Sequence, residues 1–424
     1  MKKTVKLGYI GLGRRGHHMI ELCFGTMADV QIPAICDVDP AKLERSAKMM
    51  EGMGLPRPTT YTDYKQMLAE ADIDAVIIMT GWNGRIKCAI DCMEAGKYTA
   101  IEVGCAYDIS ECHALVDAYE RTGSPVMMLE NSCYERRVLA AIRMEREGVF
   151  GELVYLSGGY YHYLNDLDLF SRDENGVIDT NHYRLAEYVY RNCDQYPTHE
   201  LGPLSKILRL NRGNRALSLT SFATKSCGLA AYVKKRVPED HPYYNTKFKQ
   251  GDIITTIIKC AGGEQITLML DTTLPRALHT SKYSVRGTKG MMDETSNDIC
   301  TYYLEGMPEK TFDNEPEFLE RFDHPLYQEW SKMEQRGGHG GIDWLTCRAF
   351  IESVKLGIEP PIDVYDTALW AAIGPLSEAS IANGSTAVEI PDFTKGQWFR
   401  RGPGTPCKYS LDLVCSDPDT PIIP

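Results

Sequence analysis

"YIGLGRRGHH" (residues 9–18) sets Gly11, Gly13 and Gly16 in the spacing GxGxxG. An apolar run, "VKLGYI" (5–10), precedes this loop, and a helical pattern follows it. In this context the first glycine allows a tight turn, the second a close approach to a pyrophosphate, and the third close helix–strand packing. Asp37 ends the next apolar run, where its carboxylate would bind the ribose hydroxyls and repel a 2′-phosphate. The stretch therefore predicts a dinucleotide site that takes NAD rather than NADP.

Strand-like and helical patterns alternate up to residue 132. The further apolar runs cover residues 30–37, 75–80, 97–103 and 125–131, and the helical patterns cover 16–24, 41–53, 84–95 and 109–122. Continuous apolar strands separated by helices predict a parallel sheet with helices on both faces. We therefore expect a Rossmann-type domain over residues 1–132, whose strand ends face the cofactor.

Three polar stretches follow strand ends of this predicted sheet: "GWNGR" (81–85), "IEVG" (101–104) and "ENSCYERR" (130–137). We expect them at the cofactor site. An exposed Trp82 would form a wall for the nicotinamide or the ribose, although core packing is an alternative for this ring. Asn131 fits a helix cap and a cofactor contact equally well.

The pattern changes after a predicted helix that Gly148 closes. Strands then follow one another at 152–163, in a hairpin over 252–271, and at 279–287, and two helices are predicted near 341–356 and 364–382. Successive strands predict an α+β domain over residues 133–395 with a mostly antiparallel open sheet. An irregular arm is expected over residues 396–424. The fold class is therefore α/β, with two domains, and residues 164–195 and 231–250 are expected to form binding loops.

Bulk composition narrows the class of function. The 424 residues carry a formal charge of −12, which disfavours nucleic acid and anionic membrane surfaces as partners. No apolar run reaches the roughly 20 residues that span a bilayer. Fourteen cysteines without a CxxC pair, and the lack of a secretory pattern, predict reduced thiols in the cytoplasm. The ten histidines show no metal-ligand spacing, so we expect no metal and a small-molecule substrate.

"YPTHELGP" (196–203) places a tyrosine and a histidine three residues apart. The proline after Tyr196 holds that residue extended, and apolar residues from Leu201 onward recur at helical spacing. His199 would then lie at the positive end of a helix, which favours a neutral imidazole that accepts protons. A packed aromatic ring and a capping histidine are the structural alternative. His339, in "HGG", is predicted to form a tight turn, and residues 307–323 a charged surface.

Several segments in order resemble glycoside hydrolase family 109, within the glucose–fructose oxidoreductase and inositol dehydrogenase superfamily. The resemblance covers residues 5–400 and includes "NSCYERR" (131–137), "GVFGELVYLSGGYYH" (148–162), "YPTHELGP", "VRGTKGM" (285–291) and "GGHGGIDW" (337–344). Many superfamily members carry Glu-Lys-Pro after the strand at 97–103, with the lysine as acid/base. This chain has Glu102-Val103-Gly104 there, which counts against a plain sugar dehydrogenase and fits family 109, which lacks the lysine.

The resemblance also implies the site residues. Those that would contact NAD are Gly11, Gly13, Arg14, Arg15, Gly16, Asp37, Trp82, Asn83, Arg85, Glu102, Val103 and Asn131. Those that would line the sugar pocket are Tyr160, Arg184, Tyr196, Pro197, Thr198, His199 and Tyr283. The pocket rim departs from the family pattern after His162, at Tyr183 and at Ser132. Acetamido recognition, the anomer and the glycoside itself therefore stay open.

By resemblance, the enzyme is an NAD-dependent α-N-acetylgalactosaminidase, and the reaction is a redox-neutral hydrolysis. NAD+ takes a hydride from carbon 3 of the sugar while a base takes the hydroxyl proton, which leaves a ketone. Carbon 2 is then deprotonated, the enolate expels the group on carbon 1, water adds at carbon 1, and the hydride returns. Direct hydrolysis would need two flanking carboxylates, which the sequence does not nominate. Tyr196 is assigned as base and His199 as its acid/base partner, with the two roles exchangeable, and Arg184 would stabilise the enolate.

Two other functions remain open from the sequence: an NAD-dependent sugar or polyol dehydrogenase, and a non-catalytic NAD(H) sensor on the same fold. Tyr196→Phe or His199→Ala should leave the ligand binding and the function of a sensor intact, whereas an enzyme should lose turnover. A homo-oligomer is expected by resemblance to the superfamily alone.

Overall fold

The computed structural model describes residues 3–165, 169–171, 182–277, 279–295, 298–333 and 336–415. Parts of the predicted binding loop 164–195 and of the predicted arm 396–424 lie outside these residues. Within the described part of the chain, no helix combines the length and the apolar character that crossing a membrane requires.

The N-terminal sheet is parallel and six-stranded, in the order β3-β2-β1-β4-β5-β6. Its strands are β1 (Val5–Ile10), β2 (Val30–Cys36), β3 (Thr59–Tyr61), β4 (Ala75–Ile78), β5 (Tyr98–Ile101) and β6 (Val126–Met128). Its helices are α1 (Arg14–Leu22), α2 (Pro40–Gly52), α3 (Tyr64–Glu70), α4 (Arg85–Glu94) and α5 (Ile109–Thr122), and a 3-10 turn, η1, covers Phe24–Thr26. The predicted Rossmann-type sheet is confirmed. The sequence did not reveal β3 and α3, because β3 is only three residues long and two of them are exposed.

The second sheet has eight strands in the order β13-β12-β11-β7-β10-β9-β8-β14, all antiparallel to their neighbours except the pair β7 and β10. They are β7 (Leu153–Tyr161), β8 (Ala216–Ala223), β9 (Ile253–Cys260), β10 (Gln265–Asp271), β11 (Thr280–Gly287), β12 (Gly290–Glu294), β13 (Cys300–Leu304) and β14 (Val388–Glu389). Along β9 burial alternates residue by residue, because one face packs on helices and the other is partly exposed. This confirms the mostly antiparallel open sheet.

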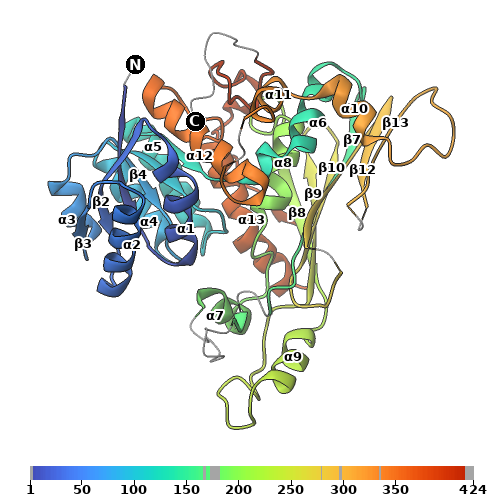
Figure 1. Ribbon diagram of the computed structural model, residues 1–424. Helices are drawn as coiled ribbons and strands as arrows, with labels where there is room; N and C mark the ends of the chain where they lie inside the picture. The colour runs from blue at the N-terminus through green and yellow to red at the C-terminus, as the bar shows by residue number, and fades with distance from the viewer. Residues whose placement is uncertain are drawn as a thin grey trace.

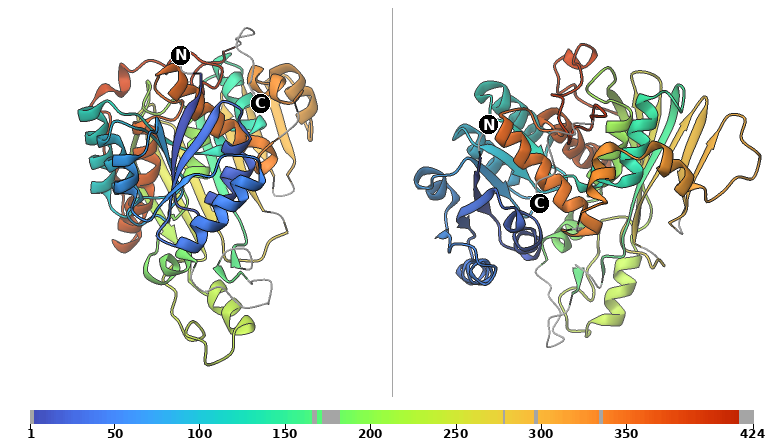
Figure 2. Two further views of the ribbon diagram at one scale, coloured as in Figure 1. Left: turned by 60° about the vertical axis from the view of Figure 1, so that its left-hand side comes forward. Right: turned by 45° about the horizontal axis from the view of Figure 1, so that its top comes forward.

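The C-terminal half also contains helices. They are α6 (Arg136–Arg146), α7 (Tyr183–Tyr190), α8 (Thr198–Ile207), α9 (Gly228–Arg236), α10 (Glu315–Phe322), α11 (Pro325–Trp330), α12 (Ile342–Leu356) and α13 (Val364–Ala382), with 3-10 turns η2 (Asn131–Tyr134), η4 (His339–Gly341) and η5 (Gln397–Phe399). Helix α13 packs against α5 and β6 on one side and against β8 and α8 on the other, as Figure 1 shows. Helix α9 projects from the body in the views of Figures 1 and 2.

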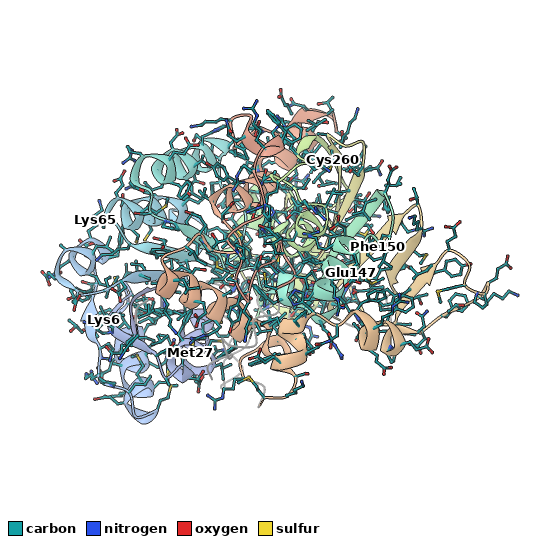
Figure 3. The ribbon with its side chains drawn as sticks, turned by 90° about the horizontal axis from the view of Figure 1, so that it is seen from above. Lys6, Met27, Lys65, Glu147, Phe150 and Cys260 are labelled. Atoms are coloured by element: carbon teal, nitrogen blue, oxygen red, sulfur yellow. The ribbon has the colours of Figure 1, made fainter. Side chains whose placement is uncertain are left out.

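Seen from above, Lys6 and Lys65 lie on the side of the parallel sheet, whereas Phe150 and Cys260 lie with the second sheet (Figure 3). Between the two sheets α12 contacts β1 and η2, so elements from both halves share one core. Because α12 and α13 bind both halves together, the residue that divides the two domains, placed by sequence at 132/133, stays a prediction.

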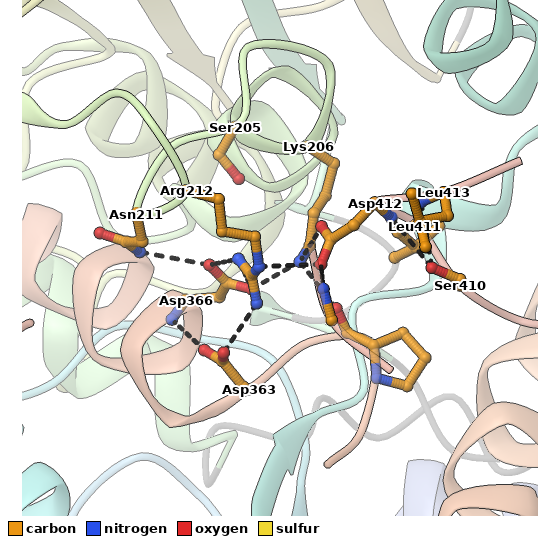
Figure 4. A network of polar contacts seen from close by, with 12 residues as sticks. Ser205, Lys206, Asn211, Arg212, Asp363, Asp366, Ser410, Leu411, Asp412 and Leu413 are labelled. Carbon is orange, nitrogen blue, oxygen red and sulfur yellow. Dashed lines mark hydrogen bonds and ion pairs between the residues drawn. The ribbon is translucent and has the colours of Figure 1, made fainter. Parts of the chain in front are cut away.

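The described part of the C-terminal arm is held by a buried ionic network (Figure 4). Asp412 of the arm accepts from Lys206 of α8 at 3.4 Å and forms an ion pair with Arg212, whose Nε lies 2.8 Å from Oδ2. The same two cations bind Asp366 of α13 at 2.5 and 3.0 Å. Removing one partner of such a buried set would leave an uncompensated charge, so the arm and α13 together fix the position of α8.

Candidate active site

One cavity of about 1810 Å³ lies where the strand ends of the parallel sheet face the second sheet. Its first section is formed by the glycine loop and the residues that follow β2, β4, β5 and β6. The second section is formed by β7, α7 and α8 and contains Tyr160, Arg184, Tyr196 and His199. A third section reaches α6, α10 and α11. The predicted cofactor and sugar residues thus meet in one space.

The glycine loop has the backbone that the sequence predicts. Gly11 has φ +92°, and a Cβ there would lie 2.8 Å from the carbonyl carbon of Met79. A Cβ on Gly16 would lie 2.1 Å from the oxygen of Gly11, so only glycine lets α1 pack this closely. A Cβ on Gly13, in contrast, would meet no atom within 4 Å, and Gly13 lines the cavity. The loop therefore leaves room for a ligand beside the first turn of α1.

Most of the predicted cofactor contacts lie on the cavity. They are Gly11, Gly13, Arg14, Arg15, Asp37, Asn83, Arg85, Glu102 and Asn131. Glu102 Oε2 and Asn131 Oδ1 are buried without a hydrogen-bond partner among the described residues. Both oxygens could accept hydrogen bonds from a bound dinucleotide, so these two residues fit the cofactor. Asp37 is held by the backbone N–H of Leu12, which donates to Oδ2 at 2.7 Å. Asn131 is not a helix cap, since it begins the turn η2 and donates to Asp343 at 2.7 Å.

Three predicted cofactor residues do not line the cavity: Gly16, Trp82 and Val103. The side chain of Trp82 is not exposed as expected but only 4% exposed, because it packs edge-on against Tyr183 and fills the space beside Gly104. Val103 is 2% exposed, and its carbonyl accepts from Arg85 at 2.7 Å. Arg85 therefore supports the backbone after β5, and direct cofactor contacts of Trp82 and Val103 stay predictions.

Tyr196 lies immediately before α8, as the helical spacing predicts, and only 8% of it is exposed. Its ring packs 4.6 Å from that of Tyr160 and 4.9 Å from the imidazole of His199. The guanidinium of Arg184 lies 4.4 Å above the ring. Burial raises the pKa of the Tyr196 phenol well above its ordinary value, although Arg184 opposes this. The phenol is therefore a hydrogen-bond donor at neutral pH.

His199, in the first turn of α8, has a carboxylate partner that the sequence did not suggest. Its Nδ1 lies 2.5 Å from Oε1 of Glu130, a fully buried acid after β6. Gly202 makes this possible, because a Cβ there would come within 2.9 Å of the Glu130 side chain. A carboxylate on Nδ1 holds the proton on that nitrogen and leaves Nε2 as the acceptor. The sequence-based expectation of a neutral imidazole took only the helix end into account. Glu130 adds a negative charge that orients the imidazole of His199.

A second histidine–carboxylate pair lies on the cavity at the turn η4. His339 has φ +51°, so the predicted tight turn is present, but its Nδ1 also lies 2.9 Å from Oδ2 of Asp343. The hydrogen bond that His339 donates to Asp343 raises the pKa of His339, against the effect of burial. Burial would raise the pKa of Asp343, but bonds from Arg15 and His339 outweigh it and lower the pKa. His339 is 61% exposed and lines the cavity, and its raised pKa favours the protonated imidazole.

Arg15 lies at the cofactor loop and also binds Asp343. Its two terminal nitrogens donate to the two oxygens of Asp343 at 2.7 and 2.8 Å, and its Nε lies 3.5 Å from Glu102. This bidentate pair joins α1 to α12 across 328 residues of sequence. Sequence reasoning predicted Arg15 as a cofactor contact and missed this partner.

The remaining residues that were predicted to line the sugar pocket divide into two groups. Tyr160 and Arg184 line the cavity, and Tyr160 stacks on His162 with ring centroids 4.2 Å apart. Burial lowers the pKa of His162 to about 3, so that ring is neutral. Pro197, Thr198 and Tyr283 are buried and do not line the cavity. Tyr283 instead donates to the backbone oxygen of His199 at 2.7 Å, which supports the start of α8 rather than a ligand.

Comparison with known proteins is consistent with this site. The chain matches the family model for "Glycosyl hydrolase 109, C-terminal domain" over residues 134–400 and that for "Oxidoreductase family, NAD-binding Rossmann fold" over residues 5–130. An alpha-N-acetylgalactosaminidase of Tannerella forsythia is 37% identical over 417 residues, 94% of this chain and 88% of the relative. A glycosyl hydrolase family 109 protein of Stenotrophomonas maltophilia is 37% identical over 420 residues, 95% of this chain and 91% of the relative. The solved structure of an inositol dehydrogenase homologue from Azotobacter vinelandii, complexed with NAD+, has a TM-score of 0.67 at 16% identity, covering 91% of this chain and 97% of that chain. It shows the shared fold.

Proposed function

Because the chain belongs to the glycosyl hydrolase 109 family, we propose that it is an NAD-dependent exo-glycosidase that releases N-acetylgalactosamine or a related sugar. NAD is the cofactor of its Rossmann domain. One observation carries the proposal: a single cavity joins the glycine loop and strand ends to Tyr160, Arg184, Tyr196 and His199. A sugar beside these four residues lies in the same space as the cofactor loop.

When bound, NAD supplies reversible hydride transfer at a sugar carbon. The chain's own residues must then move protons at the neighbouring hydroxyl and at carbon 2. His199 is the better base, because Glu130 holds the proton on Nδ1 and leaves Nε2 to accept. Of the two assignments that the sequence leaves open, we therefore choose His199 as base, since burial favours the protonated phenol of Tyr196.

Tyr196 and Arg184 are suited to stabilising a developing negative charge rather than to removing a proton. The phenol can donate to an oxygen that becomes negative, and the guanidinium above its ring adds a fixed positive charge. Both lie in a mostly buried pocket, where a donor is worth more than it is in water. We assign them to the developing enolate oxygen of the sugar.

His339 is the proton donor for the leaving group in this proposal. It is exposed on the cavity, and its raised pKa favours the protonated form. A leaving alkoxide needs a proton from an acid near neutral pKa, which a carboxylate-paired imidazole supplies. The proposal thus uses two histidines, one that accepts and one that donates.

A nitrophenyl N-acetyl-α-galactosaminide, incubated with NAD-free protein with and without added NAD+, tests the function. We expect release of nitrophenol that depends on NAD+, with no net accumulation of NADH. Stoichiometric NADH would instead support a sugar or polyol dehydrogenase, against which the buried Val103 at the strand end counts. Tyr196→Phe should abolish turnover yet leave NAD binding intact, as followed by nucleotide fluorescence. Activity that survives this variant would contradict the role of the phenol.

The localisation, the partners and the oligomeric state of the protein remain predictions. Eleven of the fourteen cysteines are buried and free, which suits the cytoplasm. The charge of −12 suits a small-molecule partner rather than nucleic acid or a membrane. The partly exposed face of the second sheet, with Phe222 50% and Ile257 36% exposed, suits a homo-oligomer. Light scattering on the purified protein measures the mass that decides the last point.

A further inference from the structure

Two acids bracket the segment that carries Tyr196 and His199. Asp194 lies two residues before the tyrosine, and Glu200 directly follows the histidine. Both side chains are fully buried, with 0% exposed, and neither lines the cavity. Proton transfer at the sugar uses neither of them. Since Asp and Glu are almost never fully buried unless they are paired, each of these acids needs a partner.

The bracketed segment is packed tightly at both ends. The backbone N–H of Asp194 donates to Oγ of Ser377 on α13 at 2.8 Å. At the other end, a Cβ on Gly158 of β7 would lie only 2.4 Å from the backbone oxygen of Glu200. Helix α8 therefore lies directly against β7 on one side and against α13 on the other (Figure 1). The two acids lie in this interior, where a charge is poorly solvated.

The carboxyl groups of the two acids bind each other. Oδ2 of Asp194 and both carboxyl oxygens of Glu200 have no hydrogen-bond donor among the described residues. The backbone N–H groups of Tyr160 and Met269 lie near Glu200 but not in hydrogen-bond geometry. The two side chains nevertheless lie within hydrogen-bond reach of each other. Two carboxyl oxygens can form a hydrogen bond only if one of them carries a proton, so the contact calls for a proton between them.

Among the described residues, no cation is left to neutralise the two acids, and neither acid forms an ion pair. The titratable groups on or beside the elements packed around them include Cys105, Cys133 of η2, Arg146 of α6, Tyr161 of β7, Arg191, Asp271 of β10, Arg276, Lys282 of β11 and Glu378 of α13. The cations of this set are bound elsewhere: Arg146 to the backbone oxygen of Lys206, Arg191 to Glu378, Arg276 to Asp271, and Lys282 over the ring of Tyr161. The negative charge of the two acids therefore has to be reduced by a proton rather than by a counter-ion.

We propose that Asp194 and Glu200 share one proton, and that this acid pair positions Tyr196 and His199 for the reaction at the sugar. The inference rests on the proposed function. Two carboxylates in contact repel each other, so that in a buried site only one of them ionises. Burial raises the pKa of Asp194 to about 7 and the pKa of Glu200 well above its ordinary value, which agrees with a proton that is kept at neutral pH.

The acid pair can act on both reacting residues through the backbone. Oδ1 of Asp194 accepts from the backbone N–H of Tyr196 at 3.4 Å, and Glu200 is the covalent neighbour of His199. With the shared proton in place, the pair draws the two ends of the segment together. When the proton is lost, two negative charges face each other and push the ends apart. A displacement of about 1 Å at a catalytic group can cost about 10²-fold in rate, so loss of the proton should slow the reaction at high pH.

The pH dependence of kcat for a nitrophenyl N-acetyl-α-galactosaminide, measured with the NAD-loaded protein, tests the acid pair. Nitrophenolate leaves without a proton, so the titration of His339 does not shape the alkaline limb for this substrate. Glu200→Gln should keep kcat at pH 7 within about threefold, because its amide N–H takes the place of the shared proton. Its alkaline limb should lie at least about one pH unit above that of the wild type, since the amide does not ionise.

Glu200→Ala removes the partner of Asp194 altogether and should lower kcat at pH 7 about 10²-fold, with KM changed less than about threefold. Asp194→Asn supplies the N–H from the other side and should behave like Glu200→Gln. Glu359→Gln is the matched control, because burial raises the pKa of this carboxyl as well, but it binds Tyr119 at 2.7 Å and does not line the cavity. Its alkaline limb should coincide with that of the wild type.

The thermal midpoint gives a second readout that needs no substrate. A carboxyl whose folded pKa is raised stabilises the fold below its unfolded pKa, roughly 4.3 for Glu, and that contribution is lost as pH rises through the folded pKa. The midpoint of the wild type should therefore fall from about pH 5 to about pH 9, and the midpoint of Glu200→Gln should fall less.

The outcomes separate the acid pair from the proposed function. If Glu200→Gln loses as much activity as Glu200→Ala, the pair does not work through a shared proton and the proposal is wrong. The proposal is equally wrong if the alkaline limb of Glu200→Gln coincides with that of the wild type, because the pair is then structural. A wild type that cleaves no glycoside with NAD present refutes the proposed function and the positioning role with it. Midpoints that still diverge with pH would then show that the shared proton serves stability alone.

Discussion

Two histidine–carboxylate pairs stand on the same cavity and differ in almost every respect except geometry. His199 and Glu130 are 2.5 Å apart, with the imidazole 14% and the carboxylate 0% exposed. His339 and Asp343 are 2.9 Å apart, with the imidazole 61% and the carboxylate 1% exposed. In both, the carboxylate binds Nδ1, and the histidine lines the cavity. They differ in the exposure of the imidazole and in how many groups share the carboxylate.

The difference shows how one pair is suited to accept a proton and the other to donate one. Glu130 has one oxygen on His199 and the backbone N–H of Ser132, and a second oxygen without a partner among the described residues, so its charge acts mainly on the imidazole. Asp343 is shared among His339, Arg15 and Asn131, which neutralise much of its charge. An exposed imidazole can also be protonated again from solvent after each turnover. Substitutions in either pair test this difference in role.

His199→Ala should have the largest effect. The loss of a general base typically costs 10²–10⁴ in rate, and we expect kcat/KM to fall about 10³-fold for every glycoside, whatever its leaving group. The measurement is initial rates on a nitrophenyl and an alkyl glycoside. His18→Ala, at an exposed histidine outside the cavity, is the matched control and should keep full activity. A loss smaller than about tenfold would remove His199 from proton transfer.

His339→Ala should separate substrates by their leaving groups. Nitrophenolate leaves without a proton, whereas a sugar alkoxide needs one, so we expect a loss of about 10²-fold for an alkyl glycoside and less than about tenfold for the nitrophenyl glycoside. Rates plotted against leaving-group pKa should be steeper in the variant than in the wild type. Equal losses on both substrates would show that His339 does not protonate the leaving group, and the contrast between the two pairs would fail.

Glu130→Gln should reduce kcat by about 10–100-fold, because a neutral amide holds the imidazole less firmly and with either tautomer. KM should change little, since Glu130 is fully buried and touches His199 rather than the cavity. Glu130→Asp, which keeps the charge, should recover part of the rate. A purely structural role would instead lower the thermal midpoint in both variants and leave the kcat of the surviving folded enzyme unchanged.

Local sequence motifs predicted the cofactor half well. Gly11, Gly16 and Asp37 act through their own backbone turn or through the strand that ends beside them, so a short stretch contains the whole signal. Glu130 carried the same signal as Asp37, an acid directly after an apolar run, and could have been predicted in the same way. Its partner His199 is 69 residues away, and only the packing of α8 through Gly202 brings the two together.

His339 shows the other limit of sequence reasoning. The glycines around it predicted a turn, and the backbone does turn there, with φ +66° at Gly340. Asp343 follows His339 by four residues in "HGGID". The sequence alone did not predict that the two side chains bind each other, because the contact depends on how α12 begins. The position of Arg15 on the far side of Asp343 depends on contacts between residues 328 apart, which periodicity does not encode.

Asp343→Asn should give the smallest loss of rate and the most specific change in pH dependence. Asp343 raises the pKa of His339, so removing its charge should lower that pKa and move the alkaline limb of kcat/KM for an alkyl glycoside to lower pH by about one unit. At the acidic end of the profile the rate should fall only about threefold, because the imidazole is protonated in either protein. Asp117→Asn, at a surface acid paired with Lys395, is the control and should leave the limb in place.

The stability of the same variant should follow the same titration. A histidine whose folded pKa is raised stabilises the fold below its unfolded pKa of about 6.5, and that contribution is lost as pH rises through the folded pKa. The thermal midpoint of Asp343→Asn should therefore lie further below the wild type at pH 5.5 than at pH 9, where the bonds from Arg15 and Asn131 to Asp343 still count. If the gap is constant across this range while the alkaline limb still moves, the titrating acid is a residue other than His339, and the exposed pair is structural.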